Sequence, residues 1–428
     1  MSMRARLRDH VASSQQALAR VFDESSALGS LRRAHLLSMT ADAMMTVALA
    51  GSLFFSVSPT EARSRIALYL LITMAPFAAL SPLVAPIVDR SRQLRRSMVT
   101  ISAVVRIAAV LLMAAFLRTL LLFPLALIAL IASKAYLITK SSLVPEVVGD
   151  PQPRTLVATN ASLTLLASVG GALGVVAGGI LAKTPHLGPA WALIAEPVAL
   201  LYMVAAGLRL HRMLPQAVAG ASQARERLRS RPTGPGYART LLASLLVAVL
   251  RGQIGFFAFV IAFALKGRSA PTWAYGAALA ASAIGAMAAT QVAPRLRRRL
   301  SEIPITLGAA TLVSLVAIAA TTAHPAIVWA IVVMGILSLA AGSAKIAFDA
   351  TVQQGLREEH YGRTFARYET EFQLAWVVGA AAATFARTPL ASGESLIATT
   401  AVVALAAYAL ATTALRHARE PELPGEGT

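Results

Sequence analysis

The chain has 428 residues, of which 57% are apolar and only 14% are charged, and its mean hydropathy is +0.65. Soluble proteins carry about 25% charged residues, so this composition argues against a soluble fold. The net charge of +19 would suit a nucleic-acid partner, but the basic residues lie in gaps between long apolar runs, which is a membrane pattern. No cysteine is present, which excludes disulfides, iron–sulfur sites and thiolate zinc sites.

Apolar runs of roughly 20 residues, the length that crosses about 30 Å of hydrocarbon, recur along the chain. They predict an all-α polytopic membrane protein with twelve spanning helices. In chain order these are 34–57, 65–87, 97–117, 121–143, 155–182, 188–208, 240–265, 271–293, 303–322, 325–348, 366–386 and 392–414.

The longest polar interval, 209–239, divides the predicted helices into two sets of six and is interpreted as a cytoplasmic linker. The predicted organisation is a basic N-terminal segment at 1–33, a six-helix bundle at 34–208, the linker, a second bundle at 240–415 and a tail at 416–428. An Arg cluster follows both the second and the eighth helix, which favours an internal repeat. Chance recurrence is the alternative, because cytoplasmic loops are generally basic.

Lys and Arg are distributed unequally over the two sides of this topology. With the N-terminus inside, 27 of them lie on the cytoplasmic side and 7 on the other. This bias predicts that both termini are cytoplasmic. The abundance of Ala and Arg favours a bacterial protein, and hence the bacterial inner membrane.

Four stretches carry short motifs. The loop after the second helix holds Asp89-Arg90 and the basic pair Arg95-Arg96, and the fifth helix holds Gly170, Gly174, Gly178 and Gly179. The first helix holds 38–42 (Ser-Met-Thr-Ala-Asp), and 362–367 (Gly-Arg-Thr-Phe-Ala-Arg) leads into the eleventh. Together these stretches resemble the major facilitator superfamily over residues 34–415, and those at 38–42 and 362–367 resemble its drug-exporter-like group.

The resemblance implies two six-helix bundles that transport a small molecule by alternating access. It implies that the 89–96 loop latches the inner gate, although Ala85 and Arg92 stand where the family's signature has glycine. The glycines of the fifth helix are similar to the antiporter signature of exporters, with Val175 in place of its proline. Close helix packing is the alternative role of those glycines.

Ionisable side chains inside the membrane are costly, so each is a candidate functional group. They are Asp42, Arg106, Lys134, Glu196, Arg251 and Lys345. The resemblance implies that helices one, four, seven and ten line a central cavity, which places Asp42, Lys134, Arg251 and Lys345 there. One acid with three bases suits an anionic or zwitterionic substrate, or salt bridges that close the inner gate.

Asp42 is the best candidate for proton coupling, because a carboxylate can bind and release a proton as its surroundings change. Its alternative role is a structural partner of Lys134 or Lys345. We expect Arg106 to be a structural partner, and Lys345 to pair with Asp349 four residues on. Glu196, which precedes Pro197, could satisfy backbone groups that the proline frees.

No histidine pair has metal-ligand spacing, no phosphate loop is present, and no nucleophile–base set is visible. We therefore expect no metal, no cofactor and no enzymatic activity. The main hypothesis is a proton-coupled exporter of a small amphiphilic compound. The alternatives are an importer or a lipid or organic-anion transporter of the same fold, and a non-transporting membrane sensor or assembly partner. The expected partners are the small-molecule substrate, protons and the lipid bilayer, without nucleic acid.

Overall fold

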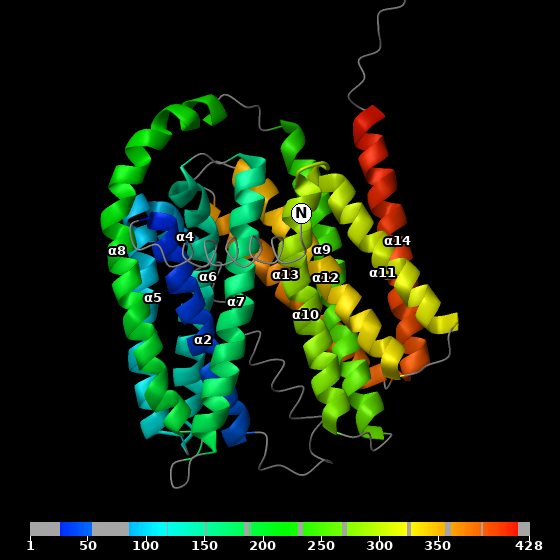
Figure 1. Ribbon diagram of the computed structural model, residues 1–428, viewed down its shortest axis with the longest axis horizontal. Helices are drawn as coiled ribbons and strands as arrows, with labels where there is room; N and C mark the ends of the chain where they lie inside the picture. Colours follow the sequence, from blue (N-terminus) through cyan, green and yellow to red (C-terminus); the bar gives the residue numbers. More distant parts are fainter. Residues whose placement is uncertain are drawn as a thin grey trace, which may run out of the picture. The chain divides into compact units, whose positions relative to one another are not determined.

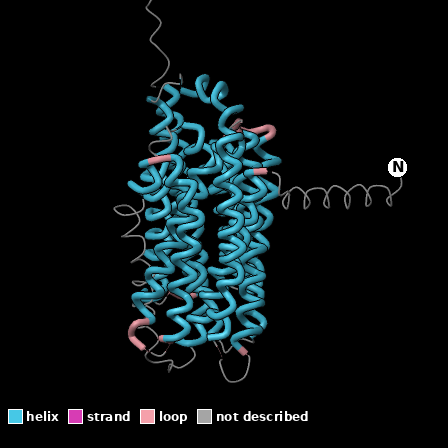
Figure 2. Tube along the Cα trace, turned by 90° about the vertical axis from the view of Figure 1, so that its left-hand side faces the viewer, coloured by secondary structure: helices cyan, strands magenta, loops and turns pink. Residues whose placement is uncertain are grey.

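The computed structural model describes residues 26–53, 85–117, 119–149, 152–183, 188, 190–229, 234–267, 272–322, 327–355, 361–386 and 388–417. Within these ranges the regular structure is entirely helical, as Figure 2 shows. The chain divides into two compact units: unit 1 comprises Met1–Arg231 with Leu356–Thr370, and unit 2 comprises Pro232–Gly355 with Glu371–Thr428.

The described helices of unit 1 are α2 (Ala27–Leu53), α4 (Ala85–Arg90), α5 (Arg92–Ala115), α6 (Leu122–Val148), α7 (Pro153–Ala182) and α8 (Ala190–Arg229). The long helices of this unit run side by side (Figure 1). Helix α2 packs against α7 and α8, and α5 packs against α6 and α8. Helix α2 is therefore enclosed by its neighbours, which brings its polar side chains into the interior of the unit.

Unit 2 contains α9 (Gly234–Gly267), α10 (Thr272–Arg297), α11 (Glu302–Thr322), α12 (Ile327–Gly355), most of α13 (Tyr361–Ala386) and α14 (Leu390–His417). Here α10 packs against α12, and α11 packs against α14 and α12. Helix α13 packs closely on α9. A Cβ atom on Gly255 would overlap the backbone of Trp376, so the absence of a side chain at Gly255 allows this approach. The first turns of α13 belong to unit 1 and the remainder to unit 2, so this helix carries the chain from one unit to the other.

Nine helices within the described residues are long and apolar enough to cross a membrane. Large apolar side chains such as Ile180, Leu279 and Leu410 are exposed on these helices, as expected for surfaces that face lipid. The prediction of an all-α polytopic membrane protein is confirmed. The predicted second helix, 65–87, lies outside the described residues except for its last three positions, which open α4.

Several helices extend beyond their predicted limits, among them α2 and α8. Helix α2 begins at Ala27, earlier than the predicted start at 34, and α8 continues to Arg229 through most of the interval interpreted as a linker. The apolar part of α8 ends at Leu214. The residues beyond it are rich in Ala, Arg and Gln, which are good helix formers. The polar composition therefore marks the end of the membrane span but not the end of the helix.

Candidate functional site

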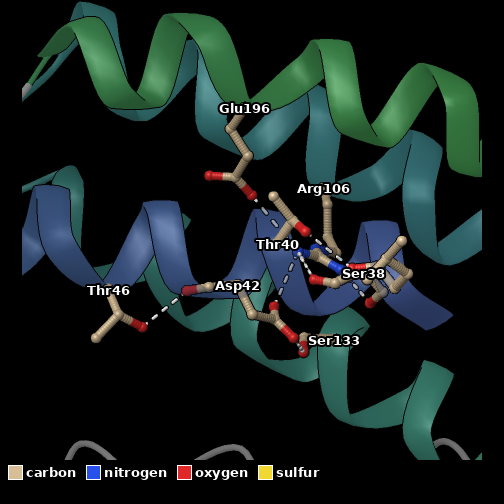
Figure 3. A network of polar contacts seen from close by, with 8 residues as sticks. Ser38, Thr40, Asp42, Thr46, Arg106, Ser133 and Glu196 are labelled. Atoms are coloured by element: carbon tan, nitrogen blue, oxygen red, sulfur yellow. Dashed lines mark hydrogen bonds and ion pairs between the residues drawn. The ribbon is translucent and has the colours of Figure 1, made fainter. Parts of the chain in front are cut away.

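A buried guanidinium connects three helices of unit 1 (Figure 3). Arg106 lies on α5, and its side chain is fully buried. Its Nη1 donates a hydrogen bond to the Ser38 hydroxyl on α2, at 2.9 Å. Its Nη2 lies 2.8 Å from Oδ1 of Asp42, also on α2, and 3.5 Å from Oε1 of Glu196 on α8. Arg106 thus contacts carboxyl groups from two different helices inside one bundle.

Asp42 is the member of this cluster that reaches the surface. Its side chain is 24% exposed, whereas those of Arg106 and Glu196 are 0% exposed. Its second oxygen, Oδ2, accepts a hydrogen bond from the Ser133 hydroxyl on α6 at 2.8 Å. On α2 itself, the Thr46 hydroxyl donates to the backbone carbonyl of Asp42 at 2.8 Å. The Asp42 carboxylate is therefore held from two sides and only partly enclosed by the protein.

The glycines of α7 bring that helix against α2 at the level of the cluster. A Cβ atom on Gly170 would overlap the carbonyl oxygen of Leu36, and one on Gly174 would overlap that of Thr40. Gly178 is also close, since its Cβ would lie 3.2 Å from the Cα of Met44. Gly179 faces open space. Three of the four predicted glycines thus fix the approach of α7 to the helix that carries Asp42.

Asp89, at the end of α4, binds the N-terminal turn of α13. Its Oδ1 accepts a hydrogen bond from the Gly362 backbone N–H at 2.6 Å, and its Oδ2 accepts one from the Arg363 N–H at 3.0 Å. The first N–H groups of a helix have no partner within the helix, and they favour a negative charge. The side chain of Arg90, the next residue in the predicted gate loop, lies outside the described part of the chain.

The basic pair of the gate-loop motif meets a buried carboxylate on α6. Arg95 Nη2 lies 3.4 Å from Oε1 of Glu146, and Arg96 Nε donates to Oε2 of Glu146 at 3.3 Å. The Glu146 side chain is 0% exposed, so two cations surround an anion that has no access to water. This ion triad joins α5 to α6 near the end of the bundle at which Asp89 lies.

The remaining candidates lie elsewhere. Lys134 follows Ser133 on α6 and is half-buried. In unit 2, Lys345 pairs with Asp349 at 2.5 Å, as the four-residue spacing predicts, and its Nζ lies 5.6 Å from the ring centroid of Phe372. Arg251 is half-buried on α9. The structure therefore assembles Asp42, Arg106 and Glu196 into one cluster and leaves the other three candidates outside it.

Sequence reasoning missed the partners within this cluster. The ion-pair partner that the structure shows for Asp42 is Arg106, which no motif indicated. The expectation that Glu196 would serve backbone groups near Pro197 is wrong, since its Oε1 accepts from Arg106. Ser38 could be found from the sequence by its spacing: it lies four residues before Asp42, and residues four apart lie on one helix face. For Ser133 the sequence carries no such signal, since its role depends on how α6 is rotated against α2.

Within the described ranges, no group of three or more His, Asp or Glu side chains is arranged to hold a metal ion. The polar groups of the cluster are one guanidinium, two hydroxyls and two carboxyl groups. Such an arrangement can bind and exchange protons, because each carboxylate has an alternative neutral state and the arginine does not.

A family model described as Major Facilitator Superfamily matches residues 34–380. The chain is 31% identical to the uncharacterized protein ML2143 of Mycobacterium leprae (strain TN), over 94% of this chain and 74% of that protein. It is 32% identical to the uncharacterized protein Rv0876c of Mycobacterium tuberculosis (strain ATCC 25618 / H37Rv), over 94% and 76% of the two chains.

Several solved transporters share the fold. The human organic anion transporter MFSD10 (TETRAN) has a TM-score of 0.68 at 15% identity, covering 91% of this chain and 99% of that one. The proton:xylose symporter XylE has a TM-score of 0.65 at 14% identity, covering 90% and 95%. A bacterial homologue of the iron transporter ferroportin, in an outward-facing state with soaked iron, has a TM-score of 0.64 at 16% identity, covering 92% and 98%. At these identities the similarity concerns the fold alone.

Proposed function

Because this multi-pass membrane protein belongs to the Major Facilitator Superfamily, whose members are transporters, we propose that it exports a small amphiphilic compound in exchange for protons. In this proposal the two units expose a substrate site alternately to either side of a bacterial inner membrane. Both termini lie in the cytoplasm, in accordance with the distribution of Lys and Arg.

The observation that carries proton coupling is the position of Asp42. Its carboxylate is partly exposed, yet it is paired with an arginine that is completely buried. A proton from water can reach Asp42, and protonation removes the negative charge that Arg106 contacts at 2.8 Å. Since Arg106 also contacts Glu196 on α8, neutralising Asp42 changes how strongly α2 is held to α5 and α8. Proton binding is thereby converted into a change in helix packing.

The contact of Asp89 supports a gating role for the 89–96 loop. Asp89 binds the first turn of α13, the helix in which the chain passes from unit 1 to unit 2. Release of these two hydrogen bonds would free the N-terminus of that helix. We assign the loop the function of stabilising one of the alternating states.

The direction of transport and the charge of the substrate are inferred from other features of the chain. The glycine stripe of α7, which resembles the antiporter signature, favours export. The cations Arg251 and Lys345 on α9 and α12 favour an anionic or zwitterionic amphiphile. The same cations would suit an importer or a lipid or organic-anion transporter, which is the second candidate function. A non-transporting sensor is the third.

Uptake into inside-out membrane vesicles under an imposed proton gradient tests the proposal. The probes are fluorescent cationic, zwitterionic and anionic amphiphiles, and the variants are Asp42→Asn and Thr46→Val. Thr46→Val is the matched control, because it lies one turn further along α2 and leaves the carboxylate in place. We expect gradient-driven uptake of at least one probe in wild type and Thr46→Val, and none in Asp42→Asn. Equal uptake by wild type and Asp42→Asn would contradict the assigned role of Asp42.

A further inference from the structure

The buried cluster of unit 1 contains two carboxylates but one cation. Arg106 and Glu196 are both 0% exposed, and Asp42 is 24% exposed. If both acids were ionised, the cluster would carry a net negative charge within a bundle that spans the membrane. An uncompensated buried charge is far more costly than a neutral polar group. The charge balance of these three groups therefore favours one proton on one of the two carboxyl groups.

The contacts distinguish the two acids. Asp42 has a guanidinium nitrogen at 2.8 Å from one oxygen and a hydroxyl donor at 2.8 Å from the other. Glu196 has only the longer Arg106 contact at 3.5 Å, and its Oε2 has no hydrogen-bond partner among the described residues. Hydrogen-bond donors and nearby cations stabilise the ionised form of a carboxyl group. Asp42 is thus the better anion, and the proton belongs on Glu196.

The other titratable groups on the packed helices do not alter this assignment. On α2, His35 is hydrogen-bonded to Tyr136 of α6, whose hydroxyl lies 3.2 Å from the Nδ1 atom of His35. On α6, Lys134 is the residue next to Ser133 and Lys140 lies nearer the end of the helix, and α7 has a single titratable residue, Arg154, in its first turn. In the described part of the chain, Arg106 is the one side chain within hydrogen-bond distance of Glu196.

We propose that Glu196 is a second proton-binding site, which holds a proton while Arg106 is paired with Asp42. Both carboxylates contact the same Arg106 Nη2 atom. In the next step the O–H bond on Glu196 breaks, an O–H bond forms on Asp42, and Arg106 becomes the partner of the Glu196 carboxylate. The charge of the cluster does not change in this step. The inference deepens the proposed function and rests on it for the role of the proton in transport.

Infrared spectroscopy of the purified full-length protein in lipid nanodiscs at neutral pH tests the protonation directly, without a substrate. We expect the wild-type spectrum to contain a C=O stretching band of a protonated carboxyl group that is lost in Glu196→Gln. The matched control is Glu146→Gln, because Glu146 is equally buried but is flanked by two cations, Arg95 and Arg96. That variant should retain the band.

Two results would overturn the inference: identical wild-type and Glu196→Gln spectra, or a band lost in Asp42→Asn instead. If Glu196→Gln does not fold, glutamate labelled with ¹³C at the side-chain carboxyl provides a second test in the wild-type protein. The label should shift the band, and the absence of any glutamate-dependent band would also refute the proposal. Because neither measurement requires transport, vesicles that transport nothing would contradict the proposed function and leave the assignment of the proton to Glu196 intact.

Discussion

Arg106 Nη2 and Asp42 Oδ1 are 2.8 Å apart and join α5 to α2 in the interior of unit 1. The guanidinium is fully buried and cannot be neutralised, whereas the carboxylate is partly exposed and can. This asymmetry underlies the proposed role of Asp42 in proton coupling, with Arg106 as the partner whose charge is fixed. It also leads us to expect that Arg106 matters for stability, because its buried charge has the carboxyl groups as its partners.

Replacing Arg106 should therefore destabilise the protein. In Arg106→Gln, two carboxylates lose their common cation, and breaking a buried ion pair in this way costs about 3–5 kcal/mol. Thermal unfolding of the purified protein in detergent would show a lowered midpoint. Arg251→Gln is the control, because the structure shows no ion pair for Arg251 with described residues, and its midpoint should change little. Equal midpoints for wild type and Arg106→Gln would show that the cluster is not the stabilising centre of unit 1.

Two glycines on one helix should respond oppositely to alanine. A Cβ at position 174 would overlap the Thr40 carbonyl oxygen, so Gly174→Ala should separate α7 from α2 and lower the unfolding midpoint. A Cβ at position 179 meets nothing within 4 Å, so Gly179→Ala should be neutral or stabilise by about 0.5–1 kcal/mol through helix propensity. The comparison separates a packing role from a general requirement for glycine. A destabilised Gly179→Ala together with an unaffected Gly174→Ala would contradict the packing described.

Removing the Asp89 carboxylate should loosen the start of α13. Asp89→Ala leaves the N–H groups of Gly362 and Arg363 without their acceptor, a loss comparable with that of a helix cap, about 0.5–2 kcal/mol. Hydrogen–deuterium exchange should become faster in a peptide covering 361–370. The peptide covering the start of α5, capped by the Ser91 hydroxyl, serves as the internal control. Unchanged exchange at 361–370 would argue against a latch at this position.

The all-helical, multi-pass membrane fold could be predicted from this sequence because the length and hydropathy of the apolar runs reflect helices that cross a bilayer. The cluster could not be predicted to the same extent. Asp42, Arg106 and Glu196 were each identified as costly groups inside the membrane, but the rotation and depth of α5 and α8 decide which of them meet. The extension of α8 to Arg229 was missed for a related reason, since hydropathy reports where the membrane ends and not where hydrogen bonding within the helix ends.

The most direct test of proton coupling through Asp42 is proton movement driven by the transported compound. Inside-out vesicles are acidified inside, an amphiphile taken up by the wild type is added, and the internal pH is followed with a fluorescent indicator. We predict that addition dissipates the gradient in wild type and Thr46→Val but not in Asp42→Asn. Alkalinisation of Asp42→Asn vesicles at the wild-type rate would show that protons are coupled elsewhere, or not at all, and would contradict the proposed role of Asp42.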